Sequence, residues 1–333
     1  MKSRHTSPKA LPTIAGMRYI LLLCATGLTV CAQTPAPPPG GNRIPREYTH
    51  KPDLANVAYG PHERNVLDLW KAKSDKPTPL VVHIHGGGFV AGDKTYVAPA
   101  LLELCLERGI SVATINYRYS WQAPYPAPYM DSVRAIQFLR AHAKEWKIDP
   151  NLVAATGGSA GAGISLWIGF HPDMAEPASD DPVKRQSTRL TVVGVTNAQV
   201  SYDPHFIAKL IDEATSHHPA LTTLVGVKPD ERESEKARRL FEESAPINYL
   251  TADDLPVFMF YNIPMKPLPP SNLNEGIHNP RFGIYLREQM VKLGIECVVH
   301  QIGEYTDGNA NAQSNRQMVE FFQKYFAGGV ARR

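Results

Sequence analysis

The chain has 333 residues, of which 43% are hydrophobic and 20% are charged. This composition is typical of a globular protein, and it excludes a wholly disordered chain, a collagen and a coiled coil. With 35 Lys and Arg against 32 Asp and Glu, the formal charge is +3. This excess of positive charge is too small to indicate a nucleic-acid-binding protein. Twelve histidines are available for catalysis or metal binding, so their positions matter more than their number.

Residues 1–32 have the pattern of a secretory signal peptide. A basic stretch without acids precedes an apolar run at 19–30, and Val30 and Ala32 offer small side chains for cleavage before Gln33. The run is too short for a membrane-spanning helix, which needs about 20 residues. We therefore expect an exported, periplasmic or extracellular protein. An uncleaved anchor, a lipoprotein acylated at Cys31 and a true start at Met17 remain open.

Removal of this segment changes the charge and the cysteine count. Four basic residues and no acidic ones are lost, which leaves 31 Lys and Arg against 32 Asp and Glu. The remaining cysteines, Cys105 and Cys297, lie in apolar patterns. Two cysteines in a chain of this length are not a disulfide framework, so we expect both to be buried free thiols.

The rest of the chain alternates between apolar strands and amphipathic helices. A Pro- and Gly-rich linker at 33–50 precedes a predicted domain at 51–329, with a polar, partly helical insertion at about 201–250. The alternation predicts an α/β fold with a mostly parallel sheet and helices on both faces. A predicted antiparallel hairpin at 57–71 forms the first two strands of this domain. The predicted strands are 80–85, 111–117, 152–156, 190–196, 257–261 and 295–302, and the predicted helices are 97–108, 129–146, 160–170, 282–293 and 313–326.

A G-x-S-x-G motif lies between a predicted strand and a predicted helix, at residues 157–161. Small residues permit a tight turn that exposes the Ser159 hydroxyl at the sheet edge, where a helix N-terminus favours developing negative charge. The motif alone is a weak signal, and its strand–turn–helix context strengthens it.

A second motif, His85-Gly86-Gly87-Gly88, directly follows a predicted strand. Glycines allow backbone N–H groups to reach an oxyanion without obstruction, and each such donor lowers the barrier by about 3 kcal/mol. The segment lacks the Lys-Ser/Thr of a nucleotide-binding P-loop. The two motifs in this order are more specific than either alone.

With these motifs, the sequence resembles the hormone-sensitive-lipase-like α/β-hydrolases, and in particular the bifunctional deacetylase/feruloyl-esterase-like (BD-FAE-like) group. The matching stretches are VLDLW, HGGGFVAGDK, NYR, Asp131, IDP and GGSAG. The resemblance implies a serine hydrolase of carboxylic esters, of the esterase, lipase or acyl-carbohydrate esterase type. It implies Ser159 as the nucleophile, an oxyanion hole at Gly87, Gly88 and Ala160, and a structural role for His85.

The general base is missing from its family position. Counting from Gly294, the family's acid falls on Glu275 and its histidine falls near Asp307, in a segment without histidine. Three alternatives remain. His278 could act as the base, with Asp307 or Glu304 as the acid; His300 could act as the base; or the triad is incomplete, and the protein is a weak hydrolase or a ligand-binding protein. We expect Ser159, Glu275 and His278 to form the catalytic set.

Other candidates are weaker. Adjacent residues such as His217 and His218 do not face one metal ion, and Tyr117-Arg118 is expected to buttress the fold. We expect no cofactor and no metal, because no metal-ligand spacing or nucleotide loop is present. The expected partner is a small-molecule or carbohydrate-linked ester, bound between the insertion and the Pro-rich loop at 263–274. The sequence predicts no nucleic-acid partner and no stable membrane span, and it leaves the oligomeric state open.

Overall fold

The computed structural model describes residues 47, 48, 50–306 and 308–328. The predicted signal peptide at 1–32 and most of the predicted linker lie outside these residues. The described chain forms an eight-stranded sheet with the order β1-β2-β4-β3-β5-β6-β7-β8. β1 and β4 pair antiparallel with β2, and all other neighbours pair parallel. The strands are β1 (Leu54–Ala58), β2 (Val66–Trp70), β3 (Thr78–Ile84), β4 (Ser111–Ile115), β5 (Ile148–Gly158), β6 (Val192–Thr196), β7 (Val257–Tyr261) and β8 (Cys297–Gln301).

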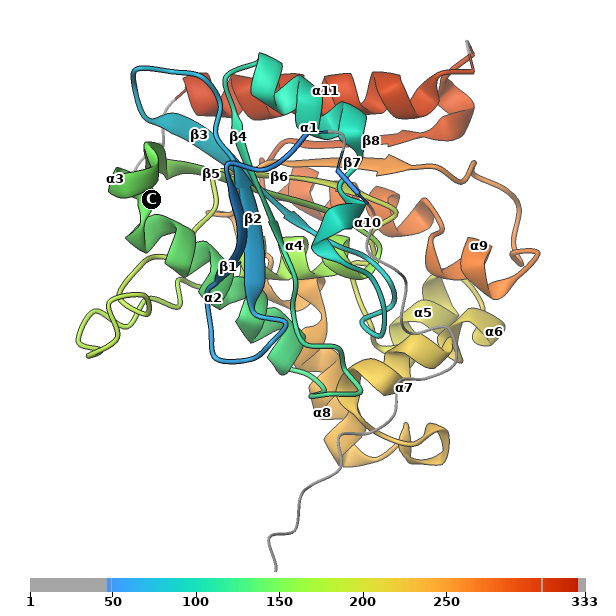
Figure 1. Ribbon diagram of the computed structural model, residues 1–333. Coiled ribbons are helices and arrows are strands. Elements are labelled where there is room, and N and C mark those ends of the chain that lie inside the picture. Colours follow the sequence, from blue (N-terminus) through green and yellow to red (C-terminus); the bar gives the residue numbers. More distant parts are fainter. Residues whose placement is uncertain (1–46, 49, 307, 329–333) are drawn as a thin grey trace, which may run out of the picture. The chain divides into compact units, whose positions relative to one another are not determined.

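Helices cover both faces of this sheet (Figure 1). α1 (Pro99–Glu107) and α11 (Ala310–Ala327) pack on one face. On the opposite face lie α2 (Ala127–Ala141), α3 (Ala143–Trp146), α4 (Ala160–Phe170) and α10 (Arg281–Lys292). The central strands are apolar on both faces because both are covered by helices. The predicted fold class, an α/β-hydrolase fold with a mostly parallel sheet, is confirmed.

The insertion between β6 and β7 contains short helices: α5 (Pro204–Leu210), α6 (Glu213–Ser216), α7 (Pro219–Val225) and α8 (Glu235–Ser244). α5, α6 and α7 lie at the lower right of Figure 1, below α9 (Leu273–Ile277), whereas α8 lies at the lower centre. Leu221, Leu224 and Phe241 are buried, so the insertion packs on the domain with an apolar face of its own. The remaining single turns are 3-10 helices at Lys94–Tyr96, Pro229–Glu231, Pro246–Tyr249 and Ile302–Glu304.

Several predicted boundaries needed correction. The predicted helix at 129–146 is divided into α2 and α3, β5 begins at Ile148 rather than 152, and α9 was not predicted. At the end of the predicted linker, Tyr48 packs edge-on against Trp70, and the Trp70 indole donates to the His50 carbonyl. Cys105 and Cys297 are buried free thiols, as expected.

Candidate active site

Ser159 occupies a tight turn between β5 and α4. Its backbone has φ 52° and ψ −117°, a conformation that is strained for a residue with a side chain. The Ser159 N–H donates to the Thr196 carbonyl at 3.0 Å. A Cβ at Gly157 or Gly161 would lie only 2.3 or 2.0 Å from the Ile84 carbonyl oxygen. The outer glycines of the motif therefore allow β3 and α4 to approach each other closely while Ser159 projects from the turn.

The His-Gly-Gly-Gly segment forms the loop after β3, beside this turn. Gly87 has φ 116°, and a Cβ there would lie 2.1 Å from the Ala91 carbonyl oxygen, so only glycine fits. Within the described part of the chain, the amide N–H groups of Gly87, Gly88 and Ala160 have no hydrogen-bond acceptor. These three residues and Ser159 line one cavity, and Gly87 and Ser159 also line a second cavity beside it. The predicted oxyanion amides are thus grouped around the serine and available to a ligand.

Buried charge anchors the loop that carries these amides. Lys94, just beyond the glycines, places Nζ 2.5 Å from Oδ2 of Asp68 on β2, and both side chains are buried. Asp68 also accepts hydrogen bonds from the Tyr48 hydroxyl and the Asn56 amide, each at 2.6 Å. The loop is therefore tied to the antiparallel edge of the sheet.

His85 has both ring nitrogens engaged away from Ser159. Its Nε2 lies 3.2 Å from Arg64 Nη2, and its Nδ1 lies 2.8 Å from the Gly86 carbonyl. An arginine can only donate, so Nε2 accepts and Nδ1 carries the proton. The ring stacks on Tyr117. Burial and the neighbouring Arg64 lower the pKa of His85 to about 3, which keeps it neutral.

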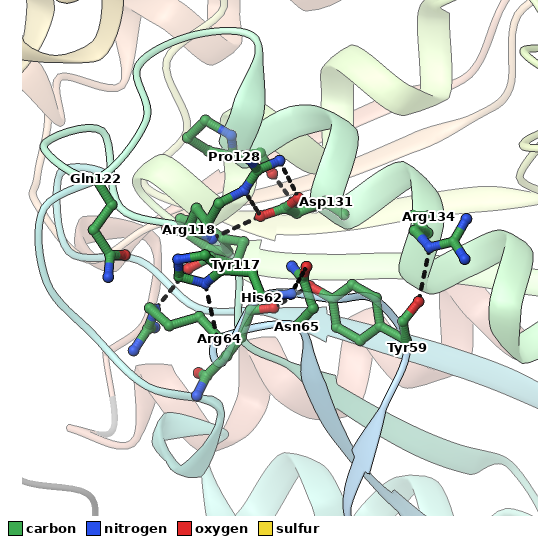
Figure 2. Close-up of polar contacts among 12 residues, drawn as sticks. Tyr59, His62, Arg64, Asn65, Tyr117, Arg118, Gln122, Pro128, Asp131 and Arg134 are labelled. Carbon is green, nitrogen blue, oxygen red and sulfur yellow. Dashed lines mark hydrogen bonds and ion pairs between the residues drawn. The ribbon is translucent and has the colours of Figure 1, made fainter. Parts of the chain in front are cut away.

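The segment after β4 supports this cluster (Figure 2). Arg118 and Asp131 form a two-pronged ion pair, with Nε–Oδ2 and Nη2–Oδ1 distances of 2.8 and 2.6 Å. Arg64 donates from Nε to the Tyr117 carbonyl at 2.7 Å, and Arg134 donates to the Tyr59 carbonyl at 2.9 Å. Tyr117 and Arg118 thus hold β4, α2 and the His85 loop together.

His278 is the histidine that reaches Ser159. It follows α9, and its Nε2 lies 2.8 Å from Ser159 Oγ. Burial and the nearby His218 lower the pKa of His278 to about 4. A neutral Nε2 at this distance can accept the serine proton, which is the geometry required of a general base.

Among the described residues, Asn274 rather than the predicted Glu275 or Glu304 contacts the second ring nitrogen of His278. The Asn274 Oδ1 lies 3.0 Å from His278 Nδ1, four residues away on the same helical turn. The sequence does not single out Asn274, because the family resemblance implies an acid as the partner of the catalytic histidine. Glu275 points elsewhere: it pairs with Lys266 Nζ at 3.0 Å and accepts from the Ser271 amide. The expectation that Glu275 belongs to the catalytic set is therefore not supported by its contacts.

Two contacts hold α9 in place. Buried Gln199 donates to the carbonyl of Ile277, the residue before His278, at 2.7 Å. α6 of the insertion lies against Gly276, where a Cβ would be 2.0 Å from Thr215 Oγ1. The position of His278 thus depends on a buried amide and on the insertion.

The other predicted alternatives are not brought to Ser159. His300 lies on β8 with its Nδ1 2.6 Å from Glu304, so these two side chains pair with each other. Asp307 lies outside the described residues. His217 pairs with Glu213 at the surface, whereas His218 caps α7 and lines a cavity next to His278. Among the described residues, no group of three or more His, Cys, Asp or Glu side chains is arranged to hold a metal ion.

Two cavities meet at Ser159 and His278. The sheet-side cavity, of about 350 Å³, lies between the sheet and α1 and α11 and is lined by His83, Tyr96, Thr156, Asn197, Asn315 and Met318, among others. The insertion-side cavity, of about 290 Å³, is lined by Phe89, Gln199, Tyr202, His218, Leu221 and Ile277, among others. The insertion lines the site as predicted, but the described residues lining these two cavities include none from the Pro-rich loop at 263–274.

Known proteins share sequence similarity with this chain. The BD-FAE family model matches residues 67–263. The probable carboxylic ester hydrolase LipM of Mycobacterium tuberculosis is 28% identical over 222 residues, covering 66% of this chain and 49% of LipM. Esterase LipQ of the same organism is 26% identical over 219 residues, covering 64% of this chain and 49% of LipQ. The chain spans about half the length of these curated relatives.

Solved structures share the fold. A truncated carbohydrate esterase from gut microbiota superposes with a TM-score of 0.67 at 20% identity, covering 86% of this chain and all of that one. The propionate-bound esterase 2 of Thermogutta terrifontis gives a TM-score of 0.58 at 20% identity, covering 84% of this chain and 97% of that one. In the described part of the chain, no helix is long and apolar enough to cross a membrane.

Proposed function

Because the chain belongs to the BD-FAE family of α/β-hydrolases, we propose that it hydrolyses carboxylic esters through an acyl-enzyme at Ser159. The observation that supports this most directly is the 2.8 Å separation of His278 Nε2 and Ser159 Oγ, beside three unpaired backbone amides. A nucleophile, a base and an oxyanion hole are the parts that acyl transfer requires.

In the proposed reaction, His278 Nε2 takes the proton of Ser159 as Oγ attacks the ester carbonyl. The oxyanion accepts hydrogen bonds from the amides of Gly87, Gly88 and Ala160. When the tetrahedral intermediate collapses, the C–O bond to the alcohol breaks and the alcohol leaves with the proton from Nε2. Water then attacks the acyl-enzyme with His278 again as the base, which releases the acid and restores Ser159.

Asn274 completes the proposed relay as the group that orients His278. When Nδ1 donates to Asn274 Oδ1, Nε2 is left unprotonated and faces Ser159. A neutral amide fixes the tautomer but does not offset the charge of the imidazolium that forms. The same orienting role is played by asparagine in papain-like proteases. We therefore propose a slower relay than one with a carboxylate.

The finer parts of the proposal concern substrate and location. We propose a small-molecule or carbohydrate-linked ester as the substrate, since the cavities measure about 350 and 290 Å³ and one structural neighbour is a carbohydrate esterase. Export after cleavage near Ala32 rests on the sequence pattern alone. The chemistry requires no cofactor, because the nucleophile, proton carrier and oxyanion donors all belong to the chain.

Hydrolysis of p-nitrophenyl acetate by Ser159→Ala, His278→Ala and His217→Ala variants tests the proposal. The first two should lower kcat/KM by at least about 10³-fold, because they remove the nucleophile and the base. His217→Ala is the matched control, since that histidine pairs with Glu213 at the surface. Full activity in His278→Ala would overturn the assignment of the base.

A fluorophosphonate probe separates the enzyme from a catalytically impaired, ligand-binding α/β-hydrolase. Stoichiometric labelling of Ser159, lost in His278→Ala, is the expected result, because labelling needs an activated serine. The absence of both labelling and ester hydrolysis in the folded wild type would favour the binding protein. An Asp307→Asn variant tests the remaining carboxylate predicted from the sequence, and we expect it to retain activity.

A further inference from the structure

His83 is a buried polar side chain that the proposed reaction does not use. It lies on β3, two residues before the oxyanion motif, and is only 8% exposed. Among the described residues neither of its ring nitrogens has a hydrogen-bond partner, and Nδ1 is closed off from solvent. Burial lowers the pKa of His83 to about 4, so the ring is neutral at pH 7 and carries one N–H.

An unpaired buried N–H group costs more than an unpaired acceptor nitrogen, so the proton belongs on the nitrogen that a ligand can reach. Because Nδ1 is enclosed, the reachable edge of the ring is the one that carries Nε2. His83 lines the sheet-side cavity, the same cavity that contains Ser159 and His278. Its Nε2–H is therefore available to an oxygen of a molecule bound at the serine.

The rest of this cavity suits a neutral group that both donates and accepts hydrogen bonds. Thr156 on β5 pairs in register with His83, and its buried hydroxyl donates to Met318 Sδ at 3.6 Å, which leaves its oxygen to accept a hydrogen bond from a ligand. Asn315 on α11 brings an amide for which the described residues supply no partner. The described lining includes no Asp, Glu, Lys or Arg, so nothing in it compensates a charged ligand.

We propose that the sheet-side cavity is a subsite for a neutral, hydroxyl-bearing half of the ester, with His83 as its hydrogen-bond donor. This inference rests on the proposed function, since it assigns part of the substrate of that same site. A site built to hydrogen-bond a hydroxyl group discriminates strongly against an analogue that lacks it, because its own polar groups are then left unpaired.

Two matched ester pairs test the subsite and identify which half of the ester enters it. Glyceryl monobutyrate and propyl butyrate differ only in the hydroxyl groups of the alcohol, whereas ethyl 3-hydroxybutyrate and ethyl butyrate differ only in one hydroxyl of the acyl group. In the wild type, one pair should show a preference in kcat/KM of at least about tenfold for the hydroxylated ester. His83→Phe should abolish that preference, and His83→Gln, which keeps an N–H donor, should restore part of it.

His205→Phe is the control, because this exposed histidine pairs with Glu233 and is not among the residues that line either cavity. Circular dichroism and thermal unfolding establish that each variant folds. A His83→Phe protein that folds and keeps the wild-type preference in both pairs would overturn the proposal, as would a wild type without preference in either pair.

A binding measurement separates failure of the subsite from failure of the proposed hydrolysis. Ser159→Ala does not form an acyl-enzyme, so calorimetric titration with the same four esters reports affinity alone. The hydroxylated member of one pair should bind at least about tenfold more tightly, and Ser159→Ala/His83→Phe should lose this difference. Equal affinities within both pairs would refute the subsite, even if the wild type hydrolyses every ester.

Discussion

The contact between Asn274 and His278 sets the electrostatic character of the site. His278, the proposed base, is neutral because burial lowers its pKa, and its Nδ1 partner is an amide that provides no counter-charge. An imidazole with a pKa near 4 remains unprotonated over most of the pH range. In the proposed enzyme, His278 is therefore a weaker base than a histidine paired with a carboxylate, but nearly all of it is in the unprotonated form that can accept a proton.

Asn274→Asp should increase kcat/KM and should shift the acid limb of the pH profile of kcat/KM to higher pH. A carboxylate at this position stabilises the imidazolium, so the pKa of His278 should rise from about 4 by roughly 1–3 units. Only the neutral imidazole is active, so wild-type activity should fall as pH drops through about 4, whereas that of Asn274→Asp should fall at higher pH. The measurement is a pH profile of kcat/KM, with enzyme stability checked at each pH.

Glu275→Gln is the control for this experiment, because Glu275 contacts Lys266 and Ser271 rather than His278. Its acid limb should coincide with that of the wild type. An unmoved limb in Asn274→Asp would mean that residue 274 does not act on the base.

At the level of elements, the nucleophile turn depends on how closely β3 and α4 pack. Gly161→Ala would place a Cβ about 2 Å from the Ile84 carbonyl, so α4 must shift. We expect a loss of about 1–3 kcal/mol in the free energy of unfolding and a lower kcat/KM, because Ser159 moves with the helix. Urea unfolding and ester hydrolysis measure the two effects. Gly303→Ala, where the nearest atom to a new Cβ is 3.7 Å away, should change neither.

The elements also explain what the sequence could and could not predict. β3, β5 and α4 are long apolar runs bounded by glycines, and these patterns predicted both the fold and the position of Ser159. α9 has five residues in a Pro-rich region without a periodic apolar face, and its local signal is confined to the Asn272 cap, whose side chain accepts from the Glu275 amide. Its position depends on Gln199 and Thr215, which are distant in sequence.

Asn274 was missed for a related reason. The family position was counted along the chain for an acid, and the count fell on Glu275, one residue away. On a helix, adjacent residues point in different directions, whereas residues four apart lie on one face. The partner of His278 therefore becomes visible only once a helix is known to precede it.

For the domain as a whole, the buried pair of Lys94 and Asp68 links the antiparallel edge of the sheet to the oxyanion loop. Lys94→Met should lower the free energy of unfolding by about 3–5 kcal/mol, because it leaves a buried carboxylate without its counter-charge. Asp68→Asn in the same chain should recover most of this loss. Urea unfolding measures both effects.

Lys184→Met is the matched control, since the Lys184–Glu176 pair is exposed and worth at most about 1 kcal/mol. Equal losses in the two lysine variants would show that the buried pair does not anchor the loop.

His278, the proposed base, and Asn274, the amide proposed to orient it, are four positions apart in one short helical turn. In a triad divided between two loops, the acid and the base must adapt to each other across separate parts of the chain. Here both residues lie in one contiguous segment, so transfer of residues 273–278 into another protein would carry both partners together. A single nucleotide change at codon 274, from asparagine to aspartate, would convert one type of relay into the other without any change elsewhere in the protein.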